Sequence, residues 1–212
     1  MRITPFIFHS DFELFANTYV ISDSFSNCVI VDPGKEDEGL IEFIENNHLT
    51  LKGILLTHGH FDHIRGITFI EKYWNVFVYM HRNDISYLID THLNCSDRFS
   101  RHEVVVNNVK IIEVDEKHPI SILEKPIQVI ETPFHTLGSI CFYLPNEKAL
   151  ISGDSLFFDS IGRTDFPGSD PRLISSSLAK LMMLDEDTHV YPGHGPETTI
   201  KNEKEQNSFV KK

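Results

Sequence analysis

The sequence predicts an α/β fold (α+β in some classifications) in which two β-sheets pack together and helices cover their outer faces. Short apolar runs rich in β-forming residues occur in two groups along the chain, and helical patterns follow each group. The chain has 212 residues, of which 41% are hydrophobic. This length and composition suit one compact domain, residues 1–212, with a sizeable core.

Three short strands open the chain. They are predicted over residues 3–8, 17–22 and 28–31. The turn Asp32-Pro33-Gly34 ends the third. Residues 37–47 then repeat apolar side chains at helical spacing, and the apolar run 53–57 predicts a buried strand.

A second group of strands follows a helix predicted over residues 81–90. These strands are expected over residues 109–114, 127–131, 140–144 and 149–152. Asp170 followed by Pro171 predicts a helix start, with Asp as the N-cap. A last short strand over residues 188–191 and a polar helix from Thr198 complete the pattern.

The strongest chemical signal is Thr57-His58-Gly59-His60-Phe61-Asp62-His63, directly after the predicted strand 53–57. Alternate residues of an extended chain point the same way, so His58 and His60 share a side. Asp62 and His63 are expected to lead into a helix from Ile64 onward. Imidazole nitrogen and carboxylate oxygen are common ligands of divalent metal ions. The cluster therefore predicts a metal site.

Three further candidate ligands each follow a predicted strand, in a segment rich in Gly or Pro: His135, Asp154 and His194. Ligands held at strand ends are what a site on a rigid sheet edge requires. The other histidines lack such a context, and we interpret them as structural or surface residues. They are His9, His48, His81, His92, His102, His118 and His189.

Composition argues against several classes of protein. The formal net charge is -12, and no basic stripe suggests binding to nucleic acid. No apolar run is long enough for a membrane span or a secretion signal. The three cysteines, Cys28, Cys95 and Cys141, form no CxxC pair and are expected to be small buried residues. These features predict a cytoplasmic protein.

These motifs resemble the metallo-β-lactamase superfamily. HxHxDH followed by an isolated His, an Asp and a final His is the pattern of that superfamily. The segments THGHFDHIRG, TPFHTLGS, GDSLFFDSIGRTDFPGSD and PGHGPETT are most similar to its glyoxalase II branch. The similarity runs from about Asn17 to Thr199. It implies a four-layer αββα sandwich, the metallo-β-lactamase fold, with the site at one edge of the two sheets.

The resemblance also implies a role for each ligand. His58, His60 and His135 would hold a first divalent ion, Asp62, His63 and His194 a second, and Asp154 would bridge both. Zinc is the first expectation, and iron and manganese accept the same ligands. Asp32 would orient a ligand histidine by a hydrogen bond, although its position in a turn equally fits a plain turn residue.

The reaction that the resemblance implies is hydrolysis of small acyl thioesters such as S-lactoylglutathione, as in hydroxyacylglutathione hydrolases. Two divalent ions ~3.5–4 Å apart can share a bridging hydroxide that attacks a carbonyl carbon. One ion would stabilise the resulting oxyanion. Asp62 would be catalytic, because it can accept a hydrogen bond from the hydroxide and orient it.

The sequence departs from the glyoxalase II pattern at three places. Phe134 replaces a small residue before the isolated histidine and is expected to narrow the pocket. Arg163 and Asp165 stand in a motif that is Gly-Lys-Phe-Tyr in glutathione-hydrolysing members. Arg163 either binds a substrate carboxylate or forms a salt bridge to Asp165. Few residues follow His194, so the chain resembles the short, single-domain members that lack the helical C-terminal domain.

Four other functions occur on this pattern or close to it. A mono-iron persulfide dioxygenase of the same superfamily has similar GRTDF motifs but generally lacks the final histidine, which is His194 here. Diiron oxygen- or nitric-oxide-reducing relatives have Glu in place of the second histidine, here His60. Nuclease relatives add RNA-binding parts, which a short acidic chain does not favour. A non-catalytic member would be expected to have lost ligands, and all seven are present. A metal-dependent hydrolase acting on a small-molecule thioester is therefore the favoured interpretation.

Overall fold

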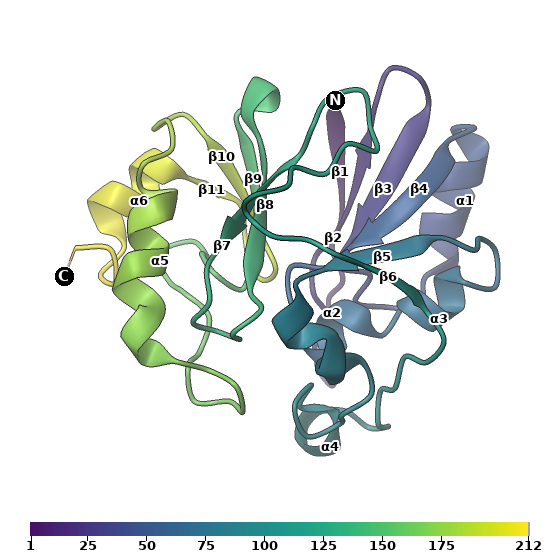
Figure 1. The fold of residues 1–212 in the computed structure, drawn as a ribbon, viewed down its shortest axis with the longest axis horizontal. Helices are drawn as coiled ribbons and strands as arrows, with labels where there is room; N and C mark the ends of the chain where they lie inside the picture. The colour runs from purple at the N-terminus through teal and green to yellow at the C-terminus, as the bar shows by residue number, and fades with distance from the viewer. Residues whose placement is uncertain (212) are drawn as a thin grey trace.

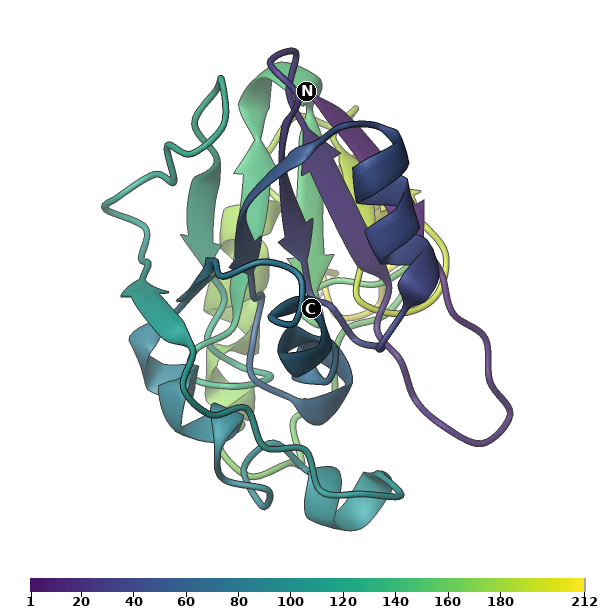
Figure 2. The ribbon, with the colours of Figure 1, turned by 90° about the vertical axis from the view of Figure 1, so that its right-hand side faces the viewer.

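The computed structural model describes residues 1–211 and confirms the predicted fold class; the last residue of the predicted domain, 212, lies outside the described residues. Two mixed sheets face each other, with α1 and α3 outside the first and α5 and α6 outside the second (Figures 1 and 2). The first sheet has the order β1-β2-β3-β4-β5-β6 and the second β11-β10-β9-β8-β7.

The first sheet and its helices come from the first half of the chain. Its strands are β1 (Arg2–Phe6), β2 (Thr18–Ser22), β3 (Asn27–Val31), β4 (Thr50–Leu55), β5 (Phe77–Met80) and β6 (Lys110–Glu113). The helices of this half are α1 (Glu38–Asn46), α2 (Phe61–Ile64), α3 (Ile67–Ile70), the 3-10 helix η1 (Arg82–Leu88) and α4 (Ser96–Phe99). Asp37 caps α1 by accepting a hydrogen bond from the Leu40 backbone N–H.

The second sheet and its helices come from the second half. Its strands are β7 (Gln128–Glu131), β8 (Ile140–Leu144), β9 (Ala149–Gly153), β10 (His189–Pro192) and β11 (Thr198–Thr199). The helices are η2 (Pro145–Glu147), η3 (Pro171–Leu173), α5 (Ile174–Leu181) and α6 (Ile200–Gln206). As predicted, Asp170 is an N-cap, here of η3, which leads directly into α5.

Alternation along the strands explains the layers. In β3, Cys28 and Ile30 pack beneath α1, whereas Val29 and Val31 face the second sheet. Side chains on a strand alternate between its two faces, so a strand buried on both sides reads as a continuous apolar run. Each of the three spaces between layers holds one apolar cluster.

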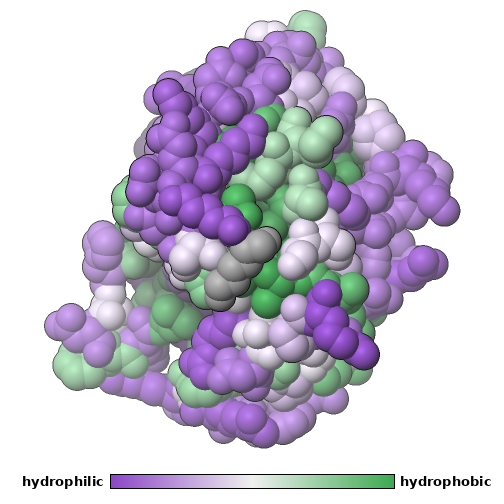
Figure 3. Space-filling model, turned by 90° about the vertical axis from the view of Figure 1, so that its left-hand side faces the viewer, coloured by the Kyte–Doolittle hydropathy of each residue, from purple (hydrophilic) through white to green (hydrophobic). Residues whose placement is uncertain are grey.

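The outer helical layer leaves part of its apolar surface accessible. Figure 3 shows apolar side chains among hydrophilic ones on the face formed by α5 and α6. A shallow groove of about 270 Å³ there is lined in part by Leu178, Met182 and Val210. No helix of the described residues is both long and apolar enough to cross a membrane. Cys28, Cys95 and Cys141 are buried and unpaired, as expected.

The structure corrects three details of the prediction. A helix is predicted over residues 81–90, and the structure has one there, Arg82–Leu88, but it is a 3-10 helix. Asp62 and His63 lie inside α2, which begins at Phe61 and not at Ile64. The sequence reasoning also missed β5, because its apolar run is short and continues directly into the next helix.

Candidate metal centre

Seven predicted ligands meet at one edge of the two sheets. His58, His135, Asp154 and His194 follow the C-terminal ends of β4, β7, β9 and β10. Of these strands, β7, β9 and β10 belong to the second sheet and run in the same direction. β9 is parallel to β10, and both β7 and β9 are antiparallel to β8. Their C-terminal ends therefore share an edge.

Two backbone hydrogen bonds join the sheets at this edge. The Ile140 N–H donates to the Thr57 carbonyl at 2.9 Å, and the Asn17 N–H donates to the Gly193 carbonyl at 2.7 Å. His58 directly follows Thr57, and His194 directly follows Gly193. These main-chain hydrogen bonds therefore hold the segments that carry the ligands in place relative to one another.

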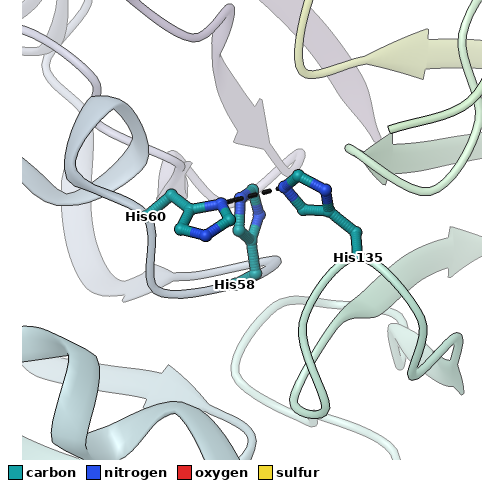
Figure 4. Close-up of side chains that lie close together, drawn as sticks. All are labelled: His58, His60 and His135. Carbon is teal, nitrogen blue, oxygen red and sulfur yellow. Dashed lines mark hydrogen bonds between the residues drawn. The ribbon is translucent and has the colours of Figure 1, made fainter. Parts of the chain in front are cut away.

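His58, His60 and His135 form the first group. Figure 4 shows the three rings pointing toward a common point, two from one loop and one from another. His60 Nδ1 lies 3.1 Å from His58 Nε2 and 2.9 Å from His135 Nε2. Three nitrogens this close, in a buried setting, are an arrangement that a divalent ion stabilises.

Burial keeps these three imidazoles neutral. It lowers the pKa of His58 well below its usual value and that of His60 to about 3, and neighbouring histidines add to both shifts. Burial also lowers the pKa of His135. A neutral ring has a free lone pair, which is the form that binds a metal.

Asp62, His63 and His194 form the second group, beside Asp154. Asp62 Oδ2 lies 3.0 Å from His194 Nε2, and Asp154 Oδ1 lies 3.3 Å from His63 Nε2. Although burial disfavours a charged carboxyl, His63 and His194 lower the pKa of Asp62 to about 2. The same two histidines hold the pKa of Asp154 well below its usual value despite burial. Both carboxylates are therefore ionised acceptors.

The donor set fits metal ions. Among the described residues, His60 Nε2 is buried without a hydrogen-bonding partner, and His63 Nε2, His194 Nε2 and Asp154 Oδ1 make no well-formed hydrogen bond beyond the ionic contacts given above. Buried polar atoms are almost always paired, so unpaired ones that converge on one point indicate a missing ligand. Nitrogen and carboxylate oxygen suit zinc, iron and manganese alike. The cluster can bind metal ions.

Hydrogen bonds behind the ligands fix their ring orientation. His63 Nδ1 lies 2.9 Å from Asp32 Oδ2, so its Nε2 faces the site. His135 Nδ1 donates to the Arg163 carbonyl at 2.7 Å, which leaves its Nε2 for a metal. Asp32 is buried and also accepts from the Thr57 backbone N–H and hydroxyl.

Gly193 is required for close approach. A Cβ at Gly193 would lie 2.3 Å from Asp154 Oδ1 and 2.8 Å from His63 Cε1. The residue before His194 must therefore lack a side chain for the second group to assemble.

Sequence reasoning missed Asp84. This carboxylate in η1 is fully buried and accepts from the Gly59 N–H at 2.9 Å and from the Thr136 hydroxyl at 2.7 Å. Burial raises the pKa of Asp84 to about 6. It joins the loop of His58 and His60 to the loop of His135. An isolated Asp after an unrecognised strand gave no signal in the sequence.

A cavity of about 420 Å³ opens above the ligands. Its floor includes His60, Asp62, His135, Asp154 and His194, and much of its wall is aromatic. Phe134 was expected to narrow this cavity, but that expectation is wrong. The Phe134 ring is fully buried in the cluster between the second sheet and α5. The wall is formed instead by rings that the sequence analysis did not single out.

Arg163 lies at the rim of this cavity. Its guanidinium makes two contacts with the Asp165 carboxylate, at 2.8 and 2.7 Å, and stacks 4.3 Å from the centre of the Phe166 ring. Both side chains of the pair are more than half exposed. The salt bridge that the sequence suggested is present, and the guanidinium remains open to solvent.

Comparison with known proteins places the chain in a family. The sequence model of the Metallo-beta-lactamase superfamily matches residues 11–194, which include all seven ligands. The chain belongs to the metallo-β-lactamase superfamily. It is 38% identical over 198 residues to the probable metallo-hydrolase YqgX of Bacillus subtilis, and the match covers 92% of each chain.

Two further relatives are similar over nearly their whole length. The hydroxyacylglutathione hydrolase GloC of Haemophilus influenzae is 34% identical over 200 residues, 92% of each chain. The crystal structure of the B3 metallo-beta-lactamase BLEG-1 superposes with a TM-score of 0.90 at 34% identity and covers all of both chains. Like these superfamily members, the chain is a metal-dependent hydrolase.

Proposed function

We propose that this metallo-β-lactamase superfamily member is a thioester hydrolase of the glyoxalase II type with a dinuclear metal site. One observation carries the proposal: Asp62, His63 and His194 form a second ligand group directly beside His58, His60 and His135. Asp154 faces both groups, 3.5 Å from His135 Nε2 and 3.3 Å from His63 Nε2. The similarity to a hydroxyacylglutathione hydrolase supports the substrate class.

The chemistry divides between ions and protein. Bound divalent ions would supply a hydroxide from water near neutral pH and polarise the substrate carbonyl. Asp62 stays ionised, so it accepts a hydrogen bond from the attacking water and orients it. The water oxygen bonds to the acyl carbon and the carbon–sulfur bond breaks. The products are a carboxylic acid, which keeps one proton of the original water, and a thiol, whose sulfur takes the proton that the water loses when the hydroxide forms.

Release of thiol from a panel of thioesters tests this function. We expect metal-loaded protein to cleave S-lactoylglutathione or a thioester of another small thiol, with loss of activity after chelation. The panel should include a β-lactam, because the similar protein BLEG-1 is a B3 metallo-beta-lactamase. It should also include glutathione persulfide, with oxygen uptake recorded. Cleavage of the β-lactam alone, or oxygen consumption without thioester cleavage, would overturn the proposal.

The metal content follows from the two ligand groups. We expect elemental analysis of saturated protein to give two ions per chain, drawn from zinc, iron and manganese. His194 completes the second group, so His194→Ala should bind one ion while the first group keeps its own. One ion per wild-type chain at saturation would contradict a dinuclear site and favour the mono-iron dioxygenase.

We propose that Arg163 contacts anionic substrates. Asp165 competes with a substrate anion for the guanidinium, because it occupies two of its donors. Arg163→Ala should raise KM for anionic thioesters by roughly two- to fivefold, as expected for an exposed ion pair. Asp165→Asn should lower KM, because it frees the same donors. Neutral thioesters serve as the control and should respond to neither change.

A structural role for Arg163 gives a different result. In that case Arg163→Ala and Asp165→Asn would lower the melting temperature and the metal content together, with KM unchanged. Parallel measurement of Tm and metal content in both variants separates the two roles.

A further inference from the structure

The wall of the cavity above the metal centre is apolar. It is formed by Leu14, Phe99, Phe157, Ile161 and Phe166, which come from three separate segments of the chain. Phe99 and Leu14 are each about half exposed, at 50% and 51%. Exposed apolar side chains that gather around a concave site indicate binding of an apolar group.

The aromatic wall rises directly from the ligands. The Phe166 ring lies 5.5 Å from the His60 ring and 5.4 Å from the Phe99 ring, centre to centre. On the other side, the Phe157 ring lies 6.1 Å from the ring of His194. A substrate carbonyl held at the ligands must therefore place one of its two substituents against these rings.

Away from the exposed donors of Arg163, the wall offers few polar partners. Among the described residues that line the cavity, Arg163 is the charged side chain outside the ligand set, and Asp165 holds it at 2.7 and 2.8 Å. Its stacking on Phe166 adds the flat face of the guanidinium to the wall. The lining also includes Ser160, but a polar substituent pressed against the rings of Phe99 and Phe157 would lose hydration without gaining a partner from those rings.

A second cavity next to the first has a different character. It has a volume of about 670 Å³ and shares Leu14 and His194 with the aromatic cavity. Its lining includes the carboxyl groups of Glu13 and Glu197 beside the apolar side chains of Ile7, Phe8 and Phe15. Within residues 1–211, the aromatic cavity has no carboxyl group outside the ligand set, so it is the better place for an apolar substituent.

We infer that the aromatic cavity binds the acyl group and that the preferred substrates are thioesters with an apolar, aliphatic or aryl, acyl group. This inference rests on the proposed thioesterase function. A lactoyl group carries a hydroxyl on its α-carbon, whereas a butanoyl, hexanoyl or benzoyl group presents hydrocarbon to the rings. The preference for apolar acyl groups comes from the removal of their hydrocarbon surface from water when they bind.

The test uses straight-chain thioesters of one thiol, from acetyl to hexanoyl, with the metal-loaded protein. We expect kcat/KM to rise about fourfold per methylene, the equivalent of ~0.8 kcal/mol for a buried CH₂. Phe99→Ala should reduce the hexanoyl-to-acetyl ratio by about tenfold, because Phe99 touches the Phe166 ring and no ligand. Phe25→Ala is the matched control, since Phe25 is 74% exposed and lies in the turn before β3.

A second series keeps an acetyl group and lengthens the alkyl chain on the sulfur. If kcat/KM rises with the length of the alkyl chain on sulfur and not with the length of the acyl chain, the assignment of the cavity is overturned. The same holds if kcat/KM depends on neither chain. Failure to cleave any thioester would instead contradict the proposed function.

Binding is measured separately by calorimetry with thioether analogues in which CH₂ replaces the carbonyl. Hexyl analogues should bind more tightly than ethyl ones, with a negative heat-capacity change that Phe99→Ala reduces. Equal binding of both analogues would contradict the inference even in an inactive protein.

Discussion

Asp154→Ala is expected to remove most of the metal and nearly all of the activity. Its Oδ1 lies 3.3 Å from His63 Nε2, and its Oδ2 lies 3.5 Å from His135 Nε2 and 3.7 Å from His194 Nε2. The carboxylate thus faces both ligand groups, and its loss weakens both positions. Because metal ions supply several kcal/mol of transition-state stabilisation, we expect kcat/KM to fall by at least about 10³-fold.

Elemental analysis at a fixed free-metal concentration and steady-state kinetics check this expectation. Asp187→Ala is the control. Asp187 is also a carboxylate, but it is 66% exposed and pairs with Lys148, not with any of the seven ligands. It should retain wild-type metal content and activity. Two ions per chain and near-normal activity in Asp154→Ala would contradict the bridging role.

Much of the fold and of the candidate site could be predicted from sequence because the signals are local. Cys28 to Val31 is a continuous apolar run, and its burial on both faces follows from strand alternation. His58, His60, Asp62 and His63 lie within one short segment, so their proximity follows from the chain itself. The structure brings His135, Asp154 and His194 to the same edge because each follows a strand.

The remaining features depend on tertiary contacts that no local pattern records. Phe99 ends α4, whereas Phe157 and Phe166 lie in the long connection between β9 and η3, and the tertiary fold brings all three to the cavity above the ligands. Phe134 illustrates the reverse. Its position beside His135 suggested that its ring would narrow the cavity, but the main chain directs the ring into the core. Asp84 contacts Gly59 and Thr136 across the site, over large sequence separations. Sequence spacing contains no information on such contacts.

Asp32 shows how a buried carboxylate can couple stability to metal binding. It accepts from the Thr57 N–H at 2.8 Å, from the Thr57 hydroxyl at 2.6 Å and from His63 Nδ1 at 2.9 Å. Its backbone has a φ of 48°, in the left-handed region that Asp and Asn tolerate better than Ala. The contact with Asp32 places a proton on His63 Nδ1, so Nε2 is the nitrogen left to bind a metal.

Asp32→Ala is therefore expected to weaken both folding and metal binding. Three buried donors lose their acceptor, so we expect the free energy of unfolding of the metal-free protein to fall by about 3–5 kcal/mol. Metal affinity should fall roughly 10- to 100-fold, because the His63 ring loses the bond that orients it. Urea denaturation and competition with a chelator measure the two effects.

Two comparison variants separate the role at the ligand from a general loss of stability. Asp32→Asn suits the left-handed backbone and keeps one acceptor for the Thr57 N–H, so its amide N–H₂ faces the Thr57 hydroxyl and His63 Nδ1, which can both accept. It should lose less stability than Asp32→Ala while still weakening metal binding, because an amide donor at His63 favours the tautomer with the proton on Nε2. Asp37→Ala removes a carboxylate that caps α1 away from the site, so it should cost about 1 kcal/mol and leave metal affinity unchanged. Wild-type metal affinity in both Asp32 variants would show that Asp32 acts as a turn residue alone.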